Sequence, residues 1–318
     1  MLLKNYKKIL VIKHGALGDL INAMGAFAEI RHQHSQAHII LLTSPAYIDL
    51  MGKTGYFNQI IGDARSRNPF LIGKLRAQLL SLNVERVYDL QNSDRTGLYF
   101  KLLGPGKRPE WSGIAPGCSH PQKRENRRKL HAFLRFADQL KMAGFDLKGK
   151  EELFPDLSWL KREISHLDFP KKAVLLVPGS SLRGAYKRWP AERYAEFALW
   201  LKDKGFNPVL LGGAEDIEVI NRILNIFPTI HNLSQKTNFF EIGVLASKSL
   251  AIIGNDTGSI HLAAAMKCPT LVLWSNASEP EIYAPRGQHV KVLYSPNLSD
   301  LRLKQVQESV LEILEYKG

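Results

Sequence analysis

The chain has 318 residues, enough for two domains of ordinary size, and its 45% hydrophobic and 23% charged residues are typical of a folded globular protein. No apolar run approaches the length of a membrane span, and the two distant cysteines, Cys118 and Cys268, form neither a disulfide framework nor a zinc pattern. These features argue against an integral membrane protein and a disulfide-rich secreted one, so we expect a protein of the reducing cytoplasm.

The positive charge is concentrated in one half of the chain. The net charge is +13, and residues 1–160 hold 24 of the 43 Lys and Arg residues but 14 of the 30 Asp and Glu residues. The first half therefore carries +10, which predicts an anionic partner there: nucleic acid, anionic lipid, or a phosphorylated or acidic sugar. Because no nucleic-acid module and no interleaving of aromatic with basic residues is present, we expect no nucleic acid.

The N-terminal region begins with the order strand, glycine-rich turn, helix. Residues 8–13 form an apolar run typical of a buried parallel strand, and residues 20–31 have a helical pattern. Gly15 and Gly18 between them are three apart, so the loop is not the dinucleotide fingerprint. Asp19 stands at the crevice end of the first strand, where a carboxylate can reach a ligand; the alternative is that it only caps the helix.

Alternating strands and helices continue to about residue 100, which predicts a parallel sheet. The expected strands are 38–43, 59–61 and 85–90, and the expected helices are 46–51 and 70–82. Residues 104–109 and 114–117 have the composition of loops. In residues 123–129, five of seven are basic, and they lead into an amphipathic helix. Cations at a helix start oppose the macrodipole, which indicates an anion site there; the alternative, a merely solvated helix start, stays open.

Residues 151–170 lose the alternation and are interpreted as an interdomain connection. A second series of parallel strands and helices follows, with strands at 172–177, 208–211, 229–233, 249–253 and 270–274 and helices beginning at Pro190 and spanning 303–314. We therefore expect an α/β fold of two doubly wound, Rossmann-like domains, residues 1–160 and 161–318, facing each other across a cleft.

The stretch from Asp256 to Gly258 connects a buried strand to an alanine-rich helix of residues 260–266. It supplies N-cap side chains and a glycine that lets the backbone approach a ligand. A helix that starts at the carboxyl end of a parallel strand points free N–H groups into the ligand crevice and binds phosphate well. The alternative is an ordinary capped helix.

Taken together, the motifs resemble glycosyltransferase family 9, the ADP-heptose:lipopolysaccharide heptosyltransferases. The resemblance runs from about residue 8 to 290 and is carried by residues 12–19, 178–181, 187–190, 212–215 and 256–265. It implies a GT-B fold, with the acceptor bound mainly by the N-terminal domain and the nucleotide-sugar by the C-terminal one. It also implies inverting transfer without a metal; the sequence has no Asp-x-Asp and no His-Glu-x-x-His, and no cofactor is expected.

The resemblance also implies residue roles. Asp19 is the expected catalytic base, and Lys187 is expected to neutralise charge on the leaving diphosphate. Further substrate-binding residues are Ser180 and Ser181 at the diphosphate, Asp256, Thr257 and Gly258 at the second phosphate contact, Glu215 at the ribose, His261 at donor sugar or phosphate, and Gly15 and Gly18. For His261 the alternative is a packed histidine. Acceptor candidates, chosen by charge and region, are Lys107, Arg108, Arg127 and Arg128.

The expected activity is transfer of heptose from ADP-heptose to a hydroxyl of the lipopolysaccharide inner core. The expected location is the cytoplasm, with peripheral contact at the inner membrane, because the anionic core acceptor is presented there and suits a basic domain. The alternatives are a GT-B transferase that moves another nucleotide-sugar onto a cell-envelope glycan, and a nucleotide-sugar epimerase.

Overall fold

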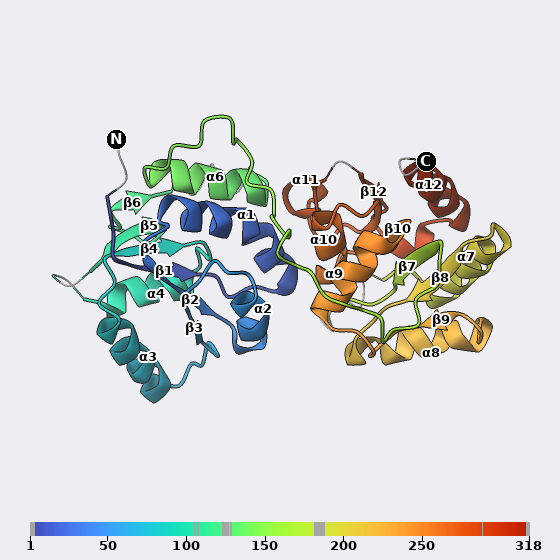
Figure 1. The fold of residues 1–318 in the computed structure, drawn as a ribbon, viewed down its shortest axis with the longest axis horizontal. Helices are drawn as coiled ribbons and strands as arrows, with labels where there is room; N and C mark the ends of the chain where they lie inside the picture. The colour runs from blue at the N-terminus through green and yellow to red at the C-terminus, as the bar shows by residue number, and fades with distance from the viewer. Residues whose placement is uncertain are drawn as a thin grey trace. The chain divides into compact units, whose positions relative to one another are not determined.

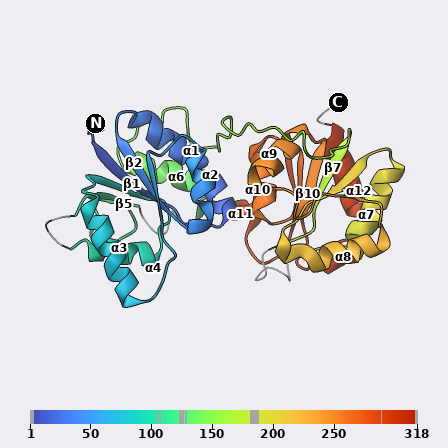
Figure 2. The same cartoon turned by 60° about the horizontal axis from the view of Figure 1, so that its bottom comes forward.

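The computed structural model describes residues 4–104, 106, 108–122, 127, 129–180, 188–287 and 289–315. The chain divides into two compact units between Trp159 and Leu160, and the described residues of each form one six-stranded parallel sheet (Figure 1). Helices cover both faces of each sheet (Figure 2). The predicted fold class, α/β with two doubly wound domains of the GT-B kind, is confirmed.

The strands are β1 (Lys8–Ile12), β2 (His38–Thr43), β3 (Gln59–Gly62), β4 (Arg86–Asp89), β5 (Glu110–Gly113), β6 (His120–Pro121), β7 (Ala173–Val177), β8 (Asn207–Leu210), β9 (His231–Asn232), β10 (Ala251–Asn255), β11 (Thr270–Trp274) and β12 (Val290–Tyr294). The helices are α1 (Leu17–Gln33), α2 (Ile48–Gly52), α3 (Pro69–Ser81), α4 (Asp94–Leu102), α6 (Ala132–Met142), α7 (Ala191–Asp203), α8 (Ile217–Ile226), α9 (Phe239–Lys248), α10 (Gly258–Ala265), α11 (Pro280–Tyr283) and α12 (Leu303–Glu315), with short 3₁₀ turns η1 (Pro45–Tyr47), η3 (Ala214–Asp216) and η4 (Leu298–Asp300).

In the first unit the strand order is β3-β2-β1-β4-β5-β6. Strands β1, β2 and β4 are almost entirely buried because helices lie on both faces: α1 and α6 on one, α3 and α4 on the other (Figure 1). The order reverses at β1, where β2 pairs on one side and β4 on the other. Ligand crevices in doubly wound folds form outside the carboxyl ends of the strands at such a reversal.

The second unit repeats the design with the order β12-β11-β10-β7-β8-β9. Its main core joins the sheet to α7, α8 and α12, while α9 and α10 lie on the opposite face (Figure 2). Strands β7, β10 and β11 are buried at every position. The reversal lies between β7 and β10, whose residues Val177 and Gly254 are paired in register. The loops after these two strands therefore emerge side by side.

Several elements differ from the sequence expectation. The first helix begins at Leu17 rather than at residue 20, and the first sheet extends past residue 100 through β5 and β6. Helix α4 and strand β12 were not predicted. Helix α6 begins at Ala132, three residues after the basic run, of which only Arg127 and Lys129 are among the described residues. No helix in the described part of the chain has the length and hydrophobicity to cross a bilayer.

Candidate active site

The loop after β1 positions Asp19. Gly15 has φ of +79°, and a Cβ on it would lie 2.9 Å from Leu20, so only glycine fits this turn. Ala16 occupies the N-cap position of α1 without a side-chain cap, and Gly18 lies inside the helix. Asp19 therefore does not cap α1; it stands in the first turn with an exposed side chain. A carboxylate there is stabilised by the helix dipole and is accessible to a ligand.

A buried polar network fixes the loop beside Asp19. His14 is 1% exposed, and its Nε2 lies 3.0 Å from an oxygen of Asp63, which also accepts a hydrogen bond from the Tyr99 hydroxyl. Burial alone would raise the pKa of the Asp63 carboxyl, but the hydrogen bonds from His14 and Tyr99 outweigh burial and hold the pKa below its ordinary value. Arg95 adds an ion pair at 3.6 Å. The network ties the ends of β1 and β3 to α4.

Two side chains near Asp19 were not predicted as site residues. Tyr47, in η1, packs against Gly15, and burial, with the Asp19 charge second, raises the pKa of its hydroxyl. Lys13, the residue after β1, is 6% exposed; burial lowers the pKa of its ammonium, while the Asp19 carboxylate opposes that shift. Asp19 thus lies within electrostatic range of both groups. Nothing in the spacing of the sequence distinguishes them from ordinary strand-end residues.

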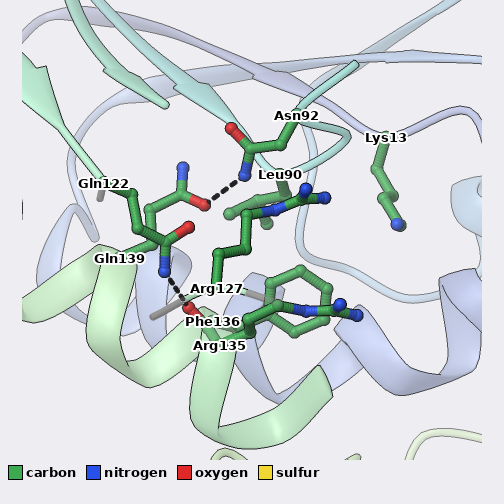
Figure 3. Close-up of a pocket in the computed structure, with 8 residues that line it drawn as sticks. All are labelled: Lys13, Leu90, Asn92, Gln122, Arg127, Arg135, Phe136 and Gln139. Carbon is green, nitrogen blue, oxygen red and sulfur yellow. Dashed lines mark hydrogen bonds between the residues drawn. The ribbon is translucent and has the colours of Figure 1, made fainter. Parts of the chain in front are cut away.

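Lys13 also lines a pocket of the first unit with an empty volume of about 230 Å³. Its walls come from the ends of β1 and β4, the segment after β6, and α6: Lys13, Leu90, Asn92, Gln122, Arg127, Arg135, Phe136 and Gln139 (Figure 3). In Figure 3 the charged ends of Lys13, Arg127 and Arg135 lie on the same side of the pocket, and the amide side chains lie on the other.

The acceptor candidates have different outcomes. Arg127 lines the pocket, whereas Arg108 places its guanidinium over the Phe100 ring, 4.3 Å from the centroid. Lys107 and Arg128 lie outside the described residues. Arg135, which also lines the pocket, was missed, because in the sequence it is one polar residue on an amphipathic helix.

In the second unit, the loop after β7 is held by Arg188. Arg188 donates to the Ser180 hydroxyl at 3.2 Å and to the Ser180 carbonyl at 2.7 Å, and pairs with Asp216 at 3.5 Å. Gly179 admits no side chain, since a Cβ would lie 2.1 Å from the Asp216 carboxylate. Ser180 is buried at the carboxyl edge of the sheet. Ser181 and Lys187 lie outside the described residues.

Asn255, at the end of β10, joins three segments. Its side-chain amide donates to the Pro178 carbonyl at 2.8 Å, and its oxygen accepts from the Trp189 backbone at 3.0 Å and from the Tyr194 hydroxyl at 3.2 Å. Trp189 is fully buried and donates its ring N–H to the Leu301 carbonyl, so it packs rather than stacks on a ligand. The loops after β7 and β10 are consequently held in contact.

At the start of α10, two buried polar atoms have no hydrogen-bond partner in the described part of the chain. Thr257 is the N-cap, yet its hydroxyl makes no cap hydrogen bond, and its buried Oγ1 has no hydrogen-bond partner among the described residues. His261, one turn further, is 7% exposed; its Nε2 lies 3.5 Å from Asp256, and its Nδ1 also has no partner there. Buried polar groups are normally satisfied, and the first N–H groups of a helix have no intrahelical partner. This arrangement can bind an anion.

Glu215 lies in η3 just beyond β8 with an exposed side chain, at the same edge as Ser180 and Thr257. Its neighbour Asp216 is the residue that contacts the loop after β7. The second unit thus collects the described donor-side candidates along the carboxyl ends of β8, β7 and β10. This follows from the strand order, since β8 pairs with β7 and β7 with β10.

Comparisons with known proteins find relatives of the whole chain. The model of glycosyltransferase family 9 (heptosyltransferase) matches residues 72–312. Lipopolysaccharide heptosyltransferase 2 of Escherichia coli strain K12 is 26% identical over 310 residues, which cover 90% of this chain and 87% of that protein.

Two solved structures share the fold. The structure of E. coli ADP-heptose lipopolysaccharide heptosyltransferase II has a TM-score of 0.76 at 24% identity and covers 98% of this chain and 99% of that one. A family 9 glycosyl transferase from Veillonella parvula has a TM-score of 0.81 at 20% identity and covers 99% of both chains. At these identities the likeness concerns the fold alone.

Proposed function

The chain belongs to glycosyltransferase family 9, the heptosyltransferase family, and from that premise we propose that it transfers heptose from ADP-heptose to a hydroxyl of the lipopolysaccharide inner core. The names of its relatives support this donor and acceptor. The observation that carries the proposal is the start of α10, where a buried hydroxyl and a buried imidazole nitrogen have no partner among the described residues. Family membership also favours transfer over epimerisation.

The second unit is proposed to bind the donor. The first N–H groups of α10 and the Thr257 hydroxyl would bind one phosphate of the ADP moiety, with His261 and Asp256 beside it. Ser180 would contact the other phosphate, with Ser181 and Lys187 as further ligands, and Glu215 would bind the ribose. Arg188 supports this role for Ser180 because its guanidinium orients both the hydroxyl and the backbone of that residue.

The first unit is proposed to bind the acceptor and to supply the base. Asp19 would take the proton from the acceptor hydroxyl as that oxygen attacks the anomeric carbon of heptose and ADP leaves. A single displacement of this kind inverts the anomeric configuration. The helix start and neighbouring cations would stabilise the charge that develops on the leaving diphosphate, and we propose that no metal ion is needed.

The proposed location is the cytoplasm, with peripheral contact at the inner membrane, where the lipid-linked acceptor is presented. The +10 charge of residues 1–160 supports this placement, because anionic lipids and a phosphorylated core both attract a basic surface.

The test combines the full chain with ADP-heptose and a core acceptor that lacks heptose, and measures ADP release together with the mass of the product. We expect ADP release only when both substrates are present, with one heptose added to the acceptor and turnover that persists in EDTA. NMR of the product should show the anomeric configuration opposite to that of the donor. Conversion of the sugar without acceptor would instead support an epimerase. If only a nucleotide-sugar other than ADP-heptose releases its nucleotide, the choice of donor is wrong.

A further inference from the structure

We propose that Asn255 is a positioning residue for the donor: its side-chain amide sets the spacing between Ser180 and the start of α10, so that the second unit prefers a nucleoside diphosphate to a nucleoside monophosphate. This inference rests on the proposed function, because it concerns the two contacts that would hold the ADP moiety. It extends to Tyr194, whose hydroxyl orients the amide. Neither Asn255 nor Tyr194 was among the candidate site residues from the sequence.

The two proposed phosphate contacts lie on neighbouring loops of the same sheet edge. Ser180 follows β7, and Thr257 is the N-cap of α10, after β10. Strands β7 and β10 pair in register at Val177 and Gly254, and a Cβ on Gly254 would lie 2.7 Å from Val177. The two backbones therefore approach closely. A diphosphate, whose two phosphates share one bridging oxygen, could contact both loops at once.

The Asn255 side chain connects these loops directly. It is fully buried, and its Nδ2 donates to the Pro178 carbonyl at 2.8 Å and to the Gly179 carbonyl at 3.3 Å. Pro178 and Gly179 immediately precede Ser180. Asn255 itself stands two residues before Thr257. One side chain thus spans the gap between the two contacts and holds one loop against the other.

The amide has a fixed orientation because its oxygen is held as well. Oδ1 accepts from the Trp189 backbone N–H at 3.0 Å and from the Tyr194 hydroxyl at 3.2 Å. Both residues belong to the buried core, and burial raises the pKa of the Tyr194 hydroxyl, which therefore keeps its proton and donates. A reversed amide would turn its oxygen toward two carbonyls and its NH₂ group toward two donors. The core thus determines which way the amide points.

The loop after β7 is also fixed from its other side, by Arg188. This residue donates to the hydroxyl and the carbonyl of Ser180 and pairs with Asp216 in η3. These contacts set Ser180 relative to the end of β8, whereas the Asn255 amide sets the same loop relative to α10. Loss of the amide should therefore leave Ser180 in place against Arg188 but let its distance from Thr257 vary.

The start of α10 supplies the gain from a second phosphate. The Thr257 hydroxyl is buried and has no hydrogen-bond partner within the described ranges, and the first N–H groups of a helix have no intrahelical partner. A monophosphate held by either loop alone satisfies one contact, whereas a diphosphate satisfies both. The preference for a diphosphate therefore reports how well the two loops are spaced before the ligand arrives.

The first experiment measures binding of ADP and of AMP to the full chain by calorimetry in EDTA. Wild type should bind ADP at least about tenfold more tightly than AMP, because the second phosphate gains charge-assisted hydrogen bonds. In Asn255→Ala this preference should fall to about threefold or less, while the Kd for AMP changes by less than about threefold. Tyr194→Phe removes one donor from the amide oxygen and keeps the ring, so it should reduce the preference by about threefold.

Thr270→Val is the matched control. Thr270 is fully buried at the amino end of β11, and its hydroxyl donates to the Cys268 carbonyl at 2.7 Å. Loss of this buried hydrogen bond should lower the melting temperature and leave the ratio of the two Kd values unchanged. The ratio therefore separates loop spacing from a general loss of stability.

Several outcomes overturn the inference. Equal affinity of the wild type for AMP and ADP would do so, and so would an unchanged preference for ADP in Tyr194→Phe and Asn255→Ala. Equal weakening of AMP and ADP in these variants would also count against it, because a general loss of structure acts on both ligands. Circular dichroism shows whether Asn255→Ala folds; if it does not, Tyr194→Phe decides alone.

The transfer assay separates this inference from the proposed function. With a core acceptor present, Tyr194→Phe should raise the KM for ADP-heptose about threefold and leave the KM for the acceptor unchanged. If heptose is transferred but both KM values stay as in wild type, only the role of the Asn255 amide fails. If the preference for ADP falls in the variants although no acceptor is glycosylated, the proposed function fails and the inference holds.

Discussion

At the scale of single residues, the carboxylate of Asp19 takes its surroundings from segments far apart in the chain. The sequence could predict Asp19, because a carboxylate at the end of the first strand of a doubly wound domain faces the ligand crevice. It could not predict Tyr47 and Lys13 around it, or Arg135 in the adjoining pocket, because their proximity arises only when α6 and η1 pack against β1. The role of Arg188 was not predicted either. The sequence motif includes it next to Lys187, but nothing in the motif assigned it a function.

Replacement of Asp19 by asparagine tests the base. The amide keeps the shape of the carboxylate but accepts no proton, so we expect turnover to fall by roughly 10² to 10⁴ while the affinity for ADP stays within a factor of about two. Steady-state ADP release and calorimetry with ADP measure the two quantities. Asp49→Asn, an exposed acid on α2, serves as control and should behave as wild type. Normal turnover in Asp19→Asn would assign the base elsewhere.

Asp89 predicts a pH dependence of stability. Burial raises the pKa of this carboxyl to about 6, although backbone N–H groups of Asn92 and Gln91 oppose the shift. The folded chain therefore holds the proton more tightly than the unfolded chain, whose carboxyl has a pKa near 4, as is usual (about 3.9). Stability contributed by this group is present below about pH 4 and is lost as the pH rises to about 6.

In Asp89→Asn that loss should disappear. Urea unfolding at pH 4.5 and pH 7.5 measures the free energy of unfolding of both proteins. Between the lower and the higher pH, the free energy of unfolding of the variant should rise relative to that of the wild type by on the order of 2 kcal/mol. Asp49→Asn again serves as control. If the stability of wild type and Asp89→Asn changes in parallel with pH, the carboxyl of Asp89 is already ionised at the lower pH.

At the scale of elements, the sequence predicts long buried strands and strongly amphipathic helices well. The parallel strands β1, β2, β7, β10 and β11 and the helices α3, α7 and α12 all lie within a few residues of their predicted ranges. Short elements whose stability comes from tertiary packing were missed. Helix α4 is set by a capping box between Ser93 and Thr96 and by burial of Tyr99 and Phe100, and β5 carries only one strongly apolar residue, Trp111.

Helix α10 yields a prediction that distinguishes a ligand site from an ordinary capped helix. Because the Thr257 hydroxyl makes no hydrogen bond in the described structure, Thr257→Val should leave the melting temperature of the unliganded chain nearly unchanged. The Kd for ADP should rise about tenfold, since a charge-assisted hydrogen bond to phosphate is lost. Calorimetry and thermal denaturation measure both.

Ser249→Ala is the matched control for that experiment. Ser249 is fully buried and donates to the Leu245 carbonyl at 2.7 Å, so its loss should lower the melting temperature without changing ADP affinity. An unchanged Kd in Thr257→Val would favour the alternative given by the sequence, an ordinary helix start.

At the scale of the whole molecule, one segment of the positively charged first half has a composition that suits a membrane surface. Residues 64–84 contain four cations, Arg65, Arg67, Lys74 and Arg76, and no acidic residue. At the start of α3 in this segment, Phe70 is 78% exposed and Leu71 is 45% exposed. Exposed apolar side chains among cations favour the interface of an anionic bilayer.

If the proposed membrane contact uses this segment, Phe70→Ser should weaken binding to vesicles that contain phosphatidylglycerol by a few-fold or more, and vesicles of phosphatidylcholine alone should bind poorly. Co-sedimentation measures the bound fraction. Ile226→Ser, which removes an apolar side chain of 44% exposure from α8, is the control and should bind as wild type. Equal binding of both variants would place the contact on another surface.

Asn255 cannot be exchanged for aspartate without loss of stability. Both ends of its carboxamide are used, and an aspartate would place a carboxylate oxygen against the carbonyl oxygen of Pro178. Such a chain would lose the hydrogen bond that connects β10 to the loop after β7, and a buried negative charge would stand beside the Trp189 backbone. A difference of one charge at this position, with almost no change of shape, should therefore lower the melting temperature of the whole second unit.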